Sequence, residues 1–165
     1  IYDTGNYQIG DTLTDRKEPL FFEPLPTFPP ELFALVTPKD TMKAKQFQKG
    51  VSQLAQEGAI QVYRNQYNEV IVGAVGQLQF EVFQYRLENE YNAKIRMDRL
   101  DFSLAPWLET EDLEKVKSML DSRTMLVFDH FDRPLILFAN QFTLNYFMEK
   151  HSDMKLLEAL DVKGL

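Results

Sequence analysis

An apolar run from Val70 to Val75 leads directly into a helical pattern that begins at Gln77, with glycines at positions 73 and 76. A strand and a helix joined by so short a turn pack against each other, and this constrains the surrounding fold. Glycine adopts positive φ and allows close backbone approach, so we interpret Gly73 and Gly76 as a structural hinge between strand and helix. Free N–H groups at the helix start could instead hold an anion.

The segments around this junction alternate between strand and helix patterns. Strands are predicted at 31–37, 59–64, 69–75 and 94–100, and helices at about 41–57 and 77–90. The order β-α-β-β-α-β favours a split βαβ, ferredoxin-like antiparallel sheet with both helices on one face. The expected fold class is therefore α+β.

Four regions are expected along the chain. Residues 1–18 carry turn residues between short apolar runs and resemble a hairpin, a short remnant of a preceding β-barrel domain. Residues 19–30 hold five of the eight prolines, which predicts a stiff, extended linker. Residues 31–100 form the split βαβ core, and residues 101–165 form a C-terminal α/β extension packed on that core.

The extension itself predicts a short helix near 110–120, a hairpin from 125–128 and 135–139, and a last helix after Asn140. Leu135 to Phe138 is apolar at every position, so this strand is expected to be buried on both faces.

The charge of the chain is acidic overall but uneven. The 165 residues give a formal net charge of −7, which disfavours general nucleic-acid binding. Between Lys39 and Arg64, however, five basic residues face only Asp40 and Glu57. No run approaches the roughly 20 apolar residues of a membrane span. Cysteine is absent, so disulfides and thiolate metal sites are excluded.

The first predicted helix and the turn before it supply one set of candidate binding residues. Lys39, Lys43 and Lys49 form a basic stripe that could contact ribonucleic acid phosphates or a protein. Lysines at exposed helical positions are common, so a solvated helix face is the alternative interpretation.

Three arginines on predicted strands supply a second set. Arg64 and Arg96 could share one face or edge of the sheet, and Arg99 follows on the same strand as Arg96. Arginine suits bidentate contact with phosphate or carboxylate groups. Pairing with Glu69 or Asp98 inside the domain is the alternative, and it is the one we favour.

Catalytic and metal sites are not predicted. His130 and His151 are the only histidines, and neither has a partner at metal-ligand spacing. A Ser/His/Asp combination is formally present but nothing in the sequence locates one. The chain also lacks the Gly-x-x-x-x-Gly-Lys-Ser/Thr loop that cradles nucleotide phosphates.

Several segments together resemble one protein family. They are Ile9–Thr14, Phe28–Phe33, Lys45–Ala59, Val72–Val82 and Arg86–Tyr91. As a linked set they resemble the translational GTPases, and among these the C-terminal (third) domain of the bacterial peptide chain release factor 3 family. The elongation factor G family is the related alternative.

The resemblance implies a ribosome-docking and regulatory domain of a GTP-dependent termination factor that promotes dissociation of class-1 release factors after peptide release. It implies a cytoplasmic protein, a monomer without membrane contact. Its expected partners are small-subunit RNA and protein, its own GTPase and β-barrel domains and, indirectly, the class-1 factor. GTP or GDP with Mg²⁺ would bind the absent N-terminal domain, so this segment itself is expected to be inert and free of cofactors.

Two further interpretations come from other functional classes. A stand-alone ferredoxin-like domain that binds or converts a small molecule is one, because that fold hosts many unrelated functions. A protein-interaction module that uses the acidic residues after position 100 is the other.

Overall fold

The computed structural model describes residues 29–157. The expected β-barrel remnant at 1–18 and most of the proline-rich segment therefore lie outside the described residues. The elements run in the order β1 (Leu32–Pro38), η1 (Thr41–Lys43), α1 (Ala44–Gln56), β2 (Gln61–Asn65), β3 (Val70–Ala74), α2 (Gln77–Glu90), β4 (Ile95–Leu100), β5 (Trp107–Glu109), α3 (Leu113–Met119), β6 (Thr124–Phe128), β7 (Pro134–Phe138), α4 (Gln141–Lys150) and β8 (Lys155–Leu157).

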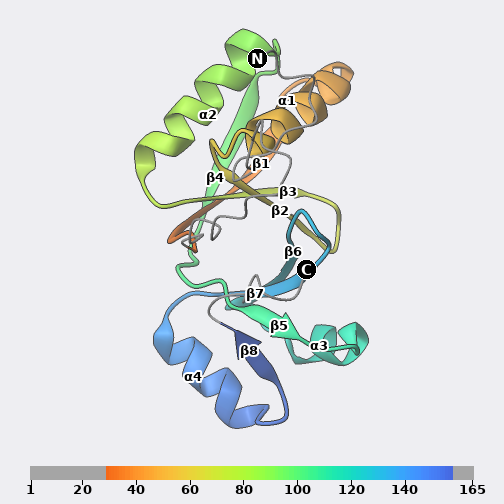
Figure 1. Cartoon of the computed structure of the whole chain (residues 1–165), viewed down its shortest axis with the longest axis vertical. Coiled ribbons are helices and arrows are strands. Elements are labelled where there is room, and N and C mark those ends of the chain that lie inside the picture. Colours follow the sequence, from red (N-terminus) through yellow and green to blue (C-terminus); the bar gives the residue numbers. More distant parts are fainter. Residues whose placement is uncertain (1–28, 158–165) are drawn as a thin grey trace, which may run out of the picture.

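A single antiparallel sheet of eight strands organises the described part of the chain, in the order β4-β1-β3-β2-β6-β7-β5-β8. Figure 1 shows α1 and α2 at one end of the molecule and α3 and α4 at the other. The first four strands have the order of a split βαβ unit. The second four continue the sheet through a short pairing of β2 with β6, in which Arg64 faces Phe128 and Asn65 faces Val127.

Both helices of the first half cover the same face of the sheet. Alternate residues of β1 and β3, such as Val36 and Val72, point toward that face because side chains alternate along a strand. They join the buried apolar residues of the helices in one core cluster, which contains Phe47, Val51, Leu54, Phe80, Phe83 and Leu87. The expected α+β fold with a split βαβ sheet is confirmed.

The two helices cross at a glycine. A Cβ atom on Gly50 of α1 would stand 2.6 Å from Cδ2 of Leu87 and 2.8 Å from Cγ of Tyr91. Nearby, the guanidinium of Arg86 on α2 binds the carboxylate of Glu57 at 2.6 Å and that of Glu90 at 2.8 Å. One close packing contact and one ion-pair cluster thus fix α1 against α2.

The reverse face of the same sheet is covered by the second half of the chain. Phe33, Tyr63 and Ile71 point to that side and pack with Val127 and Leu137. The four residues from Leu135 to Phe138 are all fully buried, as the apolar run predicted. Beyond them, a third cluster joins α4 to β6 and β7 through Phe147 and its neighbours.

Two strands have no counterpart in the sequence-based expectations. β5 and β8 contain three residues each, and they pair with one another at Trp107–Leu157 and Leu108–Leu156. Three residues are too few for an alternating pattern to be recognised. Within residues 29–157 the structure contains no helix of the length and apolar character that a membrane crossing requires.

Candidate functional site

The basic stripe is built around the turn between β1 and α1. Asp40 caps this turn, because its Oδ1 accepts a hydrogen bond of 2.9 Å from the backbone N–H of Met42. The backbone N–H of Lys39 donates to the carbonyl oxygen of Lys94, also at 2.9 Å. The turn is therefore tied to the start of β4, and Lys94 belongs to the same end of the sheet as Lys39.

The exposed side of α1 is basic because its buried side is occupied by apolar residues. Phe47, Val51 and Leu54 face the sheet. Lys45 and Lys49 stand exposed one helical turn apart, and Lys43 is half-buried in the turn before them. Residues 39–56 contain four lysines and a single acidic residue, Asp40, so this surface is positive on an otherwise acidic chain.

None of the four lysines in this segment has a carboxylate partner among residues 29–157, and the same holds for Lys94. The carboxylate nearest the other end of the helix, Glu57, is already held by hydrogen bonds from Arg86 and Gln53, which lower its pKa. We call Lys39, Lys43, Lys45, Lys49 and Lys94 the lysine surface. Unpaired ammonium groups of this kind are available to an anionic partner.

Arg64 lies next to the lysine surface. Its Nη2 donates to Oε1 of Gln48 on α1 at 2.5 Å, and its Nη1 donates to the carbonyl oxygen of Asn68 at 3.4 Å. Gln48 follows Lys45 by three residues and therefore lies on the same side of the helix. The expected pairing of Arg64 with Glu69 does not occur, because Glu69 instead accepts a hydrogen bond from Asn65 at 2.7 Å.

Arg96 and Arg99 lie apart from Arg64. The sheet order places two strands, β1 and β3, between β4 and β2. By strand alternation, Arg64 points to the helix-covered face and Arg96 to the reverse face, so the expectation that they share a face or edge is wrong. Arg96 pairs with Asp98 at 2.8 Å, the favoured alternative. The guanidinium of Arg99 lies over the ring of Phe80, 4.4 Å from its centroid.

The two glycines of the strand–helix junction have different surroundings. A Cβ atom on Gly73 would stand 2.7 Å from Cγ of Pro30 and 3.1 Å from Cε2 of Tyr63, so the close approach is to the chain before β1 and not to a helix. Gly76 has open space around it and a φ of −138°. Oε1 of Gln79 accepts hydrogen bonds from the backbone N–H groups of Val75 and Gly76, at 2.7 and 3.2 Å. These donors at the start of α2 are therefore already satisfied.

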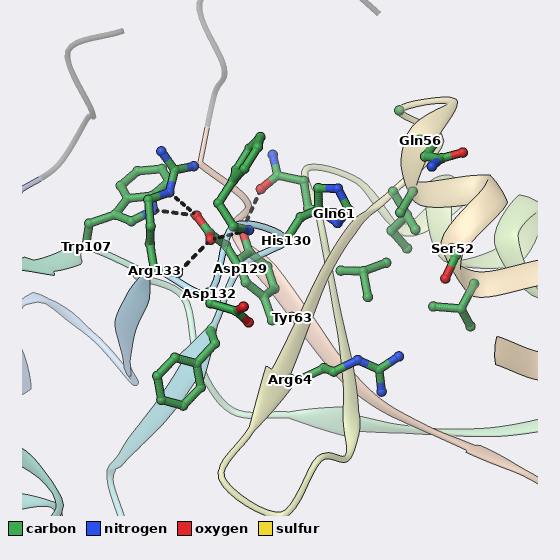
Figure 2. A pocket seen from close by; sticks show the side chains of 17 residues that line it. Ser52, Gln56, Gln61, Tyr63, Arg64, Trp107, Asp129, His130, Asp132 and Arg133 are labelled. Atoms are coloured by element: carbon green, nitrogen blue, oxygen red, sulfur yellow. Dashed lines mark hydrogen bonds and ion pairs between the residues drawn. The ribbon is translucent and has the colours of Figure 1, made fainter. Parts of the chain in front are cut away.

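A cleft of about 610 Å³ opens between α1 and β2 on one side and the turn from β6 to β7 on the other. Figure 2 shows Asp129 at the centre of its polar contacts. The Asp129 carboxylate accepts hydrogen bonds from Nε of Arg133 at 2.8 Å and from Nε1 of Trp107 at 3.2 Å. The Tyr63 hydroxyl donates to Oε1 of Gln61 at 2.6 Å. Burial, and secondarily the charge of Asp129, raises the pKa of Tyr63, so its hydroxyl stays protonated.

The residues capable of metal or acid–base chemistry do not converge. His130 is exposed beside Phe131, and the ring of His151 packs on Phe147 with 4.7 Å between centroids. Over residues 29–157, no three His, Cys, Asp or Glu side chains are arranged to hold a metal ion.

A family model described as "Class II release factor RF3, C-terminal domain" matches residues 22–148. The chain belongs to the release factor 3 family. The family expected from the sequence is confirmed. Peptide chain release factor 3 of Streptococcus uberis, of Streptococcus sanguinis and of Streptococcus thermophilus are each 52% identical to the chain over 161 residues. The match covers 97% of the chain and 31% of the length of each relative.

Sequence reasoning missed two features of this release factor 3 domain. Lys94 joins the lysine surface because β4 pairs with β1; the predicted sheet contains this pairing, but Lys94 was not among the candidate residues. The cleft collects residues from four separated segments, among them Ser52, Tyr63, Trp107 and Asp129. Lys45 is different, because it is one of the five basic residues counted between Lys39 and Arg64. It could therefore have been predicted as part of the lysine surface from the sequence.

Proposed function

We propose that this domain docks a GTP-dependent translation termination factor on the small ribosomal subunit and relays that contact to the factor's GTPase domain. The longer protein then promotes dissociation of class-1 release factors after peptide release. The observation that carries the proposal is the lysine surface, whose ammonium groups are unpaired within the described residues of a family domain that is acidic overall.

The proposal divides the work between this domain and the rest of the longer protein. The chain has no Gly-x-x-x-x-Gly-Lys-Ser/Thr sequence, and it covers 31% of the length of its relatives. We therefore assign GTP or GDP binding, with Mg²⁺, to the part of the protein outside this chain. Docking is then the contribution of this domain, and a cytoplasmic monomer is the form in which it acts.

The lysine surface suits ribosomal RNA because phosphate contacts by lysine need charge and not a fixed geometry. Arg64, joined to α1 through Gln48, extends the same positive side. On α2, by contrast, Leu78, Val82 and Tyr85 are exposed apolar side chains at helical spacing. Such side chains suit contact with protein, which supports a ribosomal protein as a second part of the docking site.

The test uses the full-length factor with Lys43→Glu and Lys49→Glu together. The control reverses two other lysines, Lys117→Glu and Lys155→Glu, which changes the net charge equally. Those two lysines pair with Glu114 and Glu109 at the opposite end of the molecule (Figure 1). Ribosome binding and ribosome-stimulated GTP hydrolysis should fall for the first pair only.

The salt dependence adds a second measurement. Each phosphate contact contributes roughly 0.7 to 0.9 to the slope of log affinity against log salt concentration, so the slope should be shallower in the first variant. Unchanged binding and hydrolysis in that variant would refute docking through the lysine surface.

A further inference from the structure

The cleft between α1, β2 and the β6–β7 turn has an aromatic lining. Tyr63, Trp107, Phe128 and Phe131 all contribute to its wall. Phe131 is 58% exposed, so part of this aromatic surface faces the open side of the cleft. Figure 2 shows Ser52 and Gln56 of α1 on one side and Trp107, Asp129 and Arg133 on the other.

The polar groups deep in this cleft are engaged with one another. The carboxylate of Asp129 accepts hydrogen bonds from the backbone N–H groups of Phe131 and Arg133, in addition to Trp107 and the Arg133 side chain. Tyr63 donates its hydroxyl hydrogen to Gln61. What the cleft offers a ligand is therefore chiefly apolar and aromatic surface.

The described chain begins beside this cleft. Pro30 is buried, and it crowds the same point over Gly73 as the ring of Tyr63, a cleft residue. The next residue, Glu31, donates its backbone N–H to the carbonyl oxygen of Ala74 and so starts the pairing of β1 with β3. The start of the described chain, at Pro30, is thus close to Tyr63, one of the residues that line the cleft.

The preceding ten residues have the composition of a ligand for such a surface. Residues 19–28 read Pro-Leu-Phe-Phe-Glu-Pro-Leu-Pro-Thr-Phe, with three prolines and five large apolar residues. Proline-rich segments bind aromatic-lined grooves as extended chains, because little conformational freedom is lost on binding. In that conformation ten residues reach about 31 Å.

We propose that residues 19–28 bind in the aromatic cleft of their own domain. The family model supports one unit, because its match starts at residue 22, inside this segment. Attachment at Pro29 makes the binding intramolecular, which raises the effective concentration of the segment at the cleft. The bound segment sets the direction in which the chain before residue 19 leaves the domain, and hence its position relative to the lysine surface.

Engineered cysteines test the location of the segment. The chain has no native cysteine, so two introduced thiols react only with each other or with a reagent. The test pair is Leu25→Cys with Ser52→Cys, which lines the cleft and is exposed. The control pair is Leu25→Cys with Ser118→Cys, an exposed position on α3. A short bismaleimide should join the first pair within one chain, in clearly higher yield than the second.

The single tryptophan supplies an independent measurement on the full chain. Trp107 lines the cleft and is half-buried. Replacing Phe22 and Leu25 by serine should raise quenching of its fluorescence by acrylamide and shift the emission to longer wavelength. Phe142→Ser, which removes an exposed aromatic ring from α4, should change neither.

The outcomes separate the possible occupants. A cross-link found mainly between two chains would assign the cleft to a second copy and overturn the proposal. If the quenching of Trp107 changed only when ribosomes were added, the cleft would belong to a ribosomal partner. That result would also overturn the proposal. Equal cross-linking of both pairs, or quenching unaffected by the segment substitutions, would also overturn it. Docking through the lysine surface is tested by ribosome binding and GTP hydrolysis, and binding of residues 19–28 by cross-linking and fluorescence. Either proposal can therefore fail while the other holds.

Discussion

Gly50 of α1 lies against Leu87 of α2 so closely that a methyl group at position 50 would stand 2.6 Å from the Leu87 side chain. Leu87 is fully buried, and two ring atoms of Tyr91 would stand 2.8 and 2.9 Å from the same methyl group. Leu87 has no room to move, and the half-buried ring of Tyr91 would have to shift toward solvent to accept a methyl group. The spacing between the two helices is thus set by the absence of a side chain at one position.

Gly50→Ala is therefore expected to destabilise the domain. Overpacking a close contact costs about 1–3 kcal/mol, whereas alanine gains only about 0.5–1 kcal/mol over glycine within a helix. Urea unfolding should show a lower free energy of unfolding. Ser52→Ala, on the exposed side of the same helix, is the control and should be neutral or slightly stabilising. Equal stability of the two variants would mean that the helices separate easily at this point.

A second glycine gives a prediction about the chain before β1. Gly73→Ala places a methyl group 2.7 Å from the ring of Pro30, and about 1–3 kcal/mol of stability should be lost. Because Pro30 causes the clash, the loss should be smaller when Gly73→Ala is made in a Pro30→Gly background. A double-mutant cycle measures this coupling, and strictly additive losses would show that Pro30 is not the obstacle.

The ion-pair cluster of Arg86 predicts a dependence of stability on acid. Hydrogen bonds from Arg86 lower the pKa of both Glu57 and Glu90 from the ordinary value of 4.5. Folding thus favours their ionised forms, so the stabilisation is complete above pH 4.5 and is lost as the pH falls through the folded-state values. The contribution is small, because these side chains are partly exposed and screened by solvent.

The corresponding variant is Arg86→Met, which keeps the aliphatic part of the side chain. It should be less stable than the unsubstituted chain near neutral pH, and the difference should narrow at about pH 3. Urea unfolding at a series of pH values measures both. Arg123→Met, whose contact with Asp121 is long at 3.9 Å and exposed, should show no such narrowing. A constant difference for Arg86→Met would indicate lost packing as the main effect.

Lys94 lies far from the other lysines of the lysine surface in the sequence but beside Lys39 in the structure, so we expect it to contact the ribosome with them. On the proposed docking function, Lys94→Gln in the full-length factor should weaken ribosome binding and reduce the salt slope by roughly 0.7 to 0.9. Arg96→Gln is the matched control two residues away, because Arg96 points to the reverse face and already pairs with Asp98. A reduced slope in the control, with none for Lys94→Gln, would move the docking site to the reverse face.

The first half of the fold could be predicted because its segments are long enough to show their period. Phe47, Val51 and Leu54 repeat at helical spacing, and their stripe coincides with the buried side of α1. The first five residues of the run at 70–75 likewise form β3, a fully buried strand, and only Val75 beyond its end is exposed. In both places the local pattern and the tertiary packing favour the same conformation.

The rest depended on contacts between distant residues. Arg64 was free, on local grounds, to pair with Glu69, but Asn65 uses that carboxylate to close the hairpin. Trp107 meets Asp129 across 22 positions, and nothing near either residue indicates the contact. Of the candidate residues, the lysines of α1 and of the turn before it could be found from charge alone. Their lack of internal carboxylate partners within residues 29–157 could not be.

The end strand β4 has a consequence for how the molecule behaves at high concentration. In the described part of the chain it is the last strand of the sheet, so one side of its backbone is left without a neighbouring strand. The charged residues Arg96, Asp98 and Arg99 occupy half of its six positions. Pairing of a strand from a second molecule with β4 would require desolvation of these charged groups, which is unfavourable. The sheet of eight strands formed by the described residues is therefore protected at this edge against the addition of strands from other molecules.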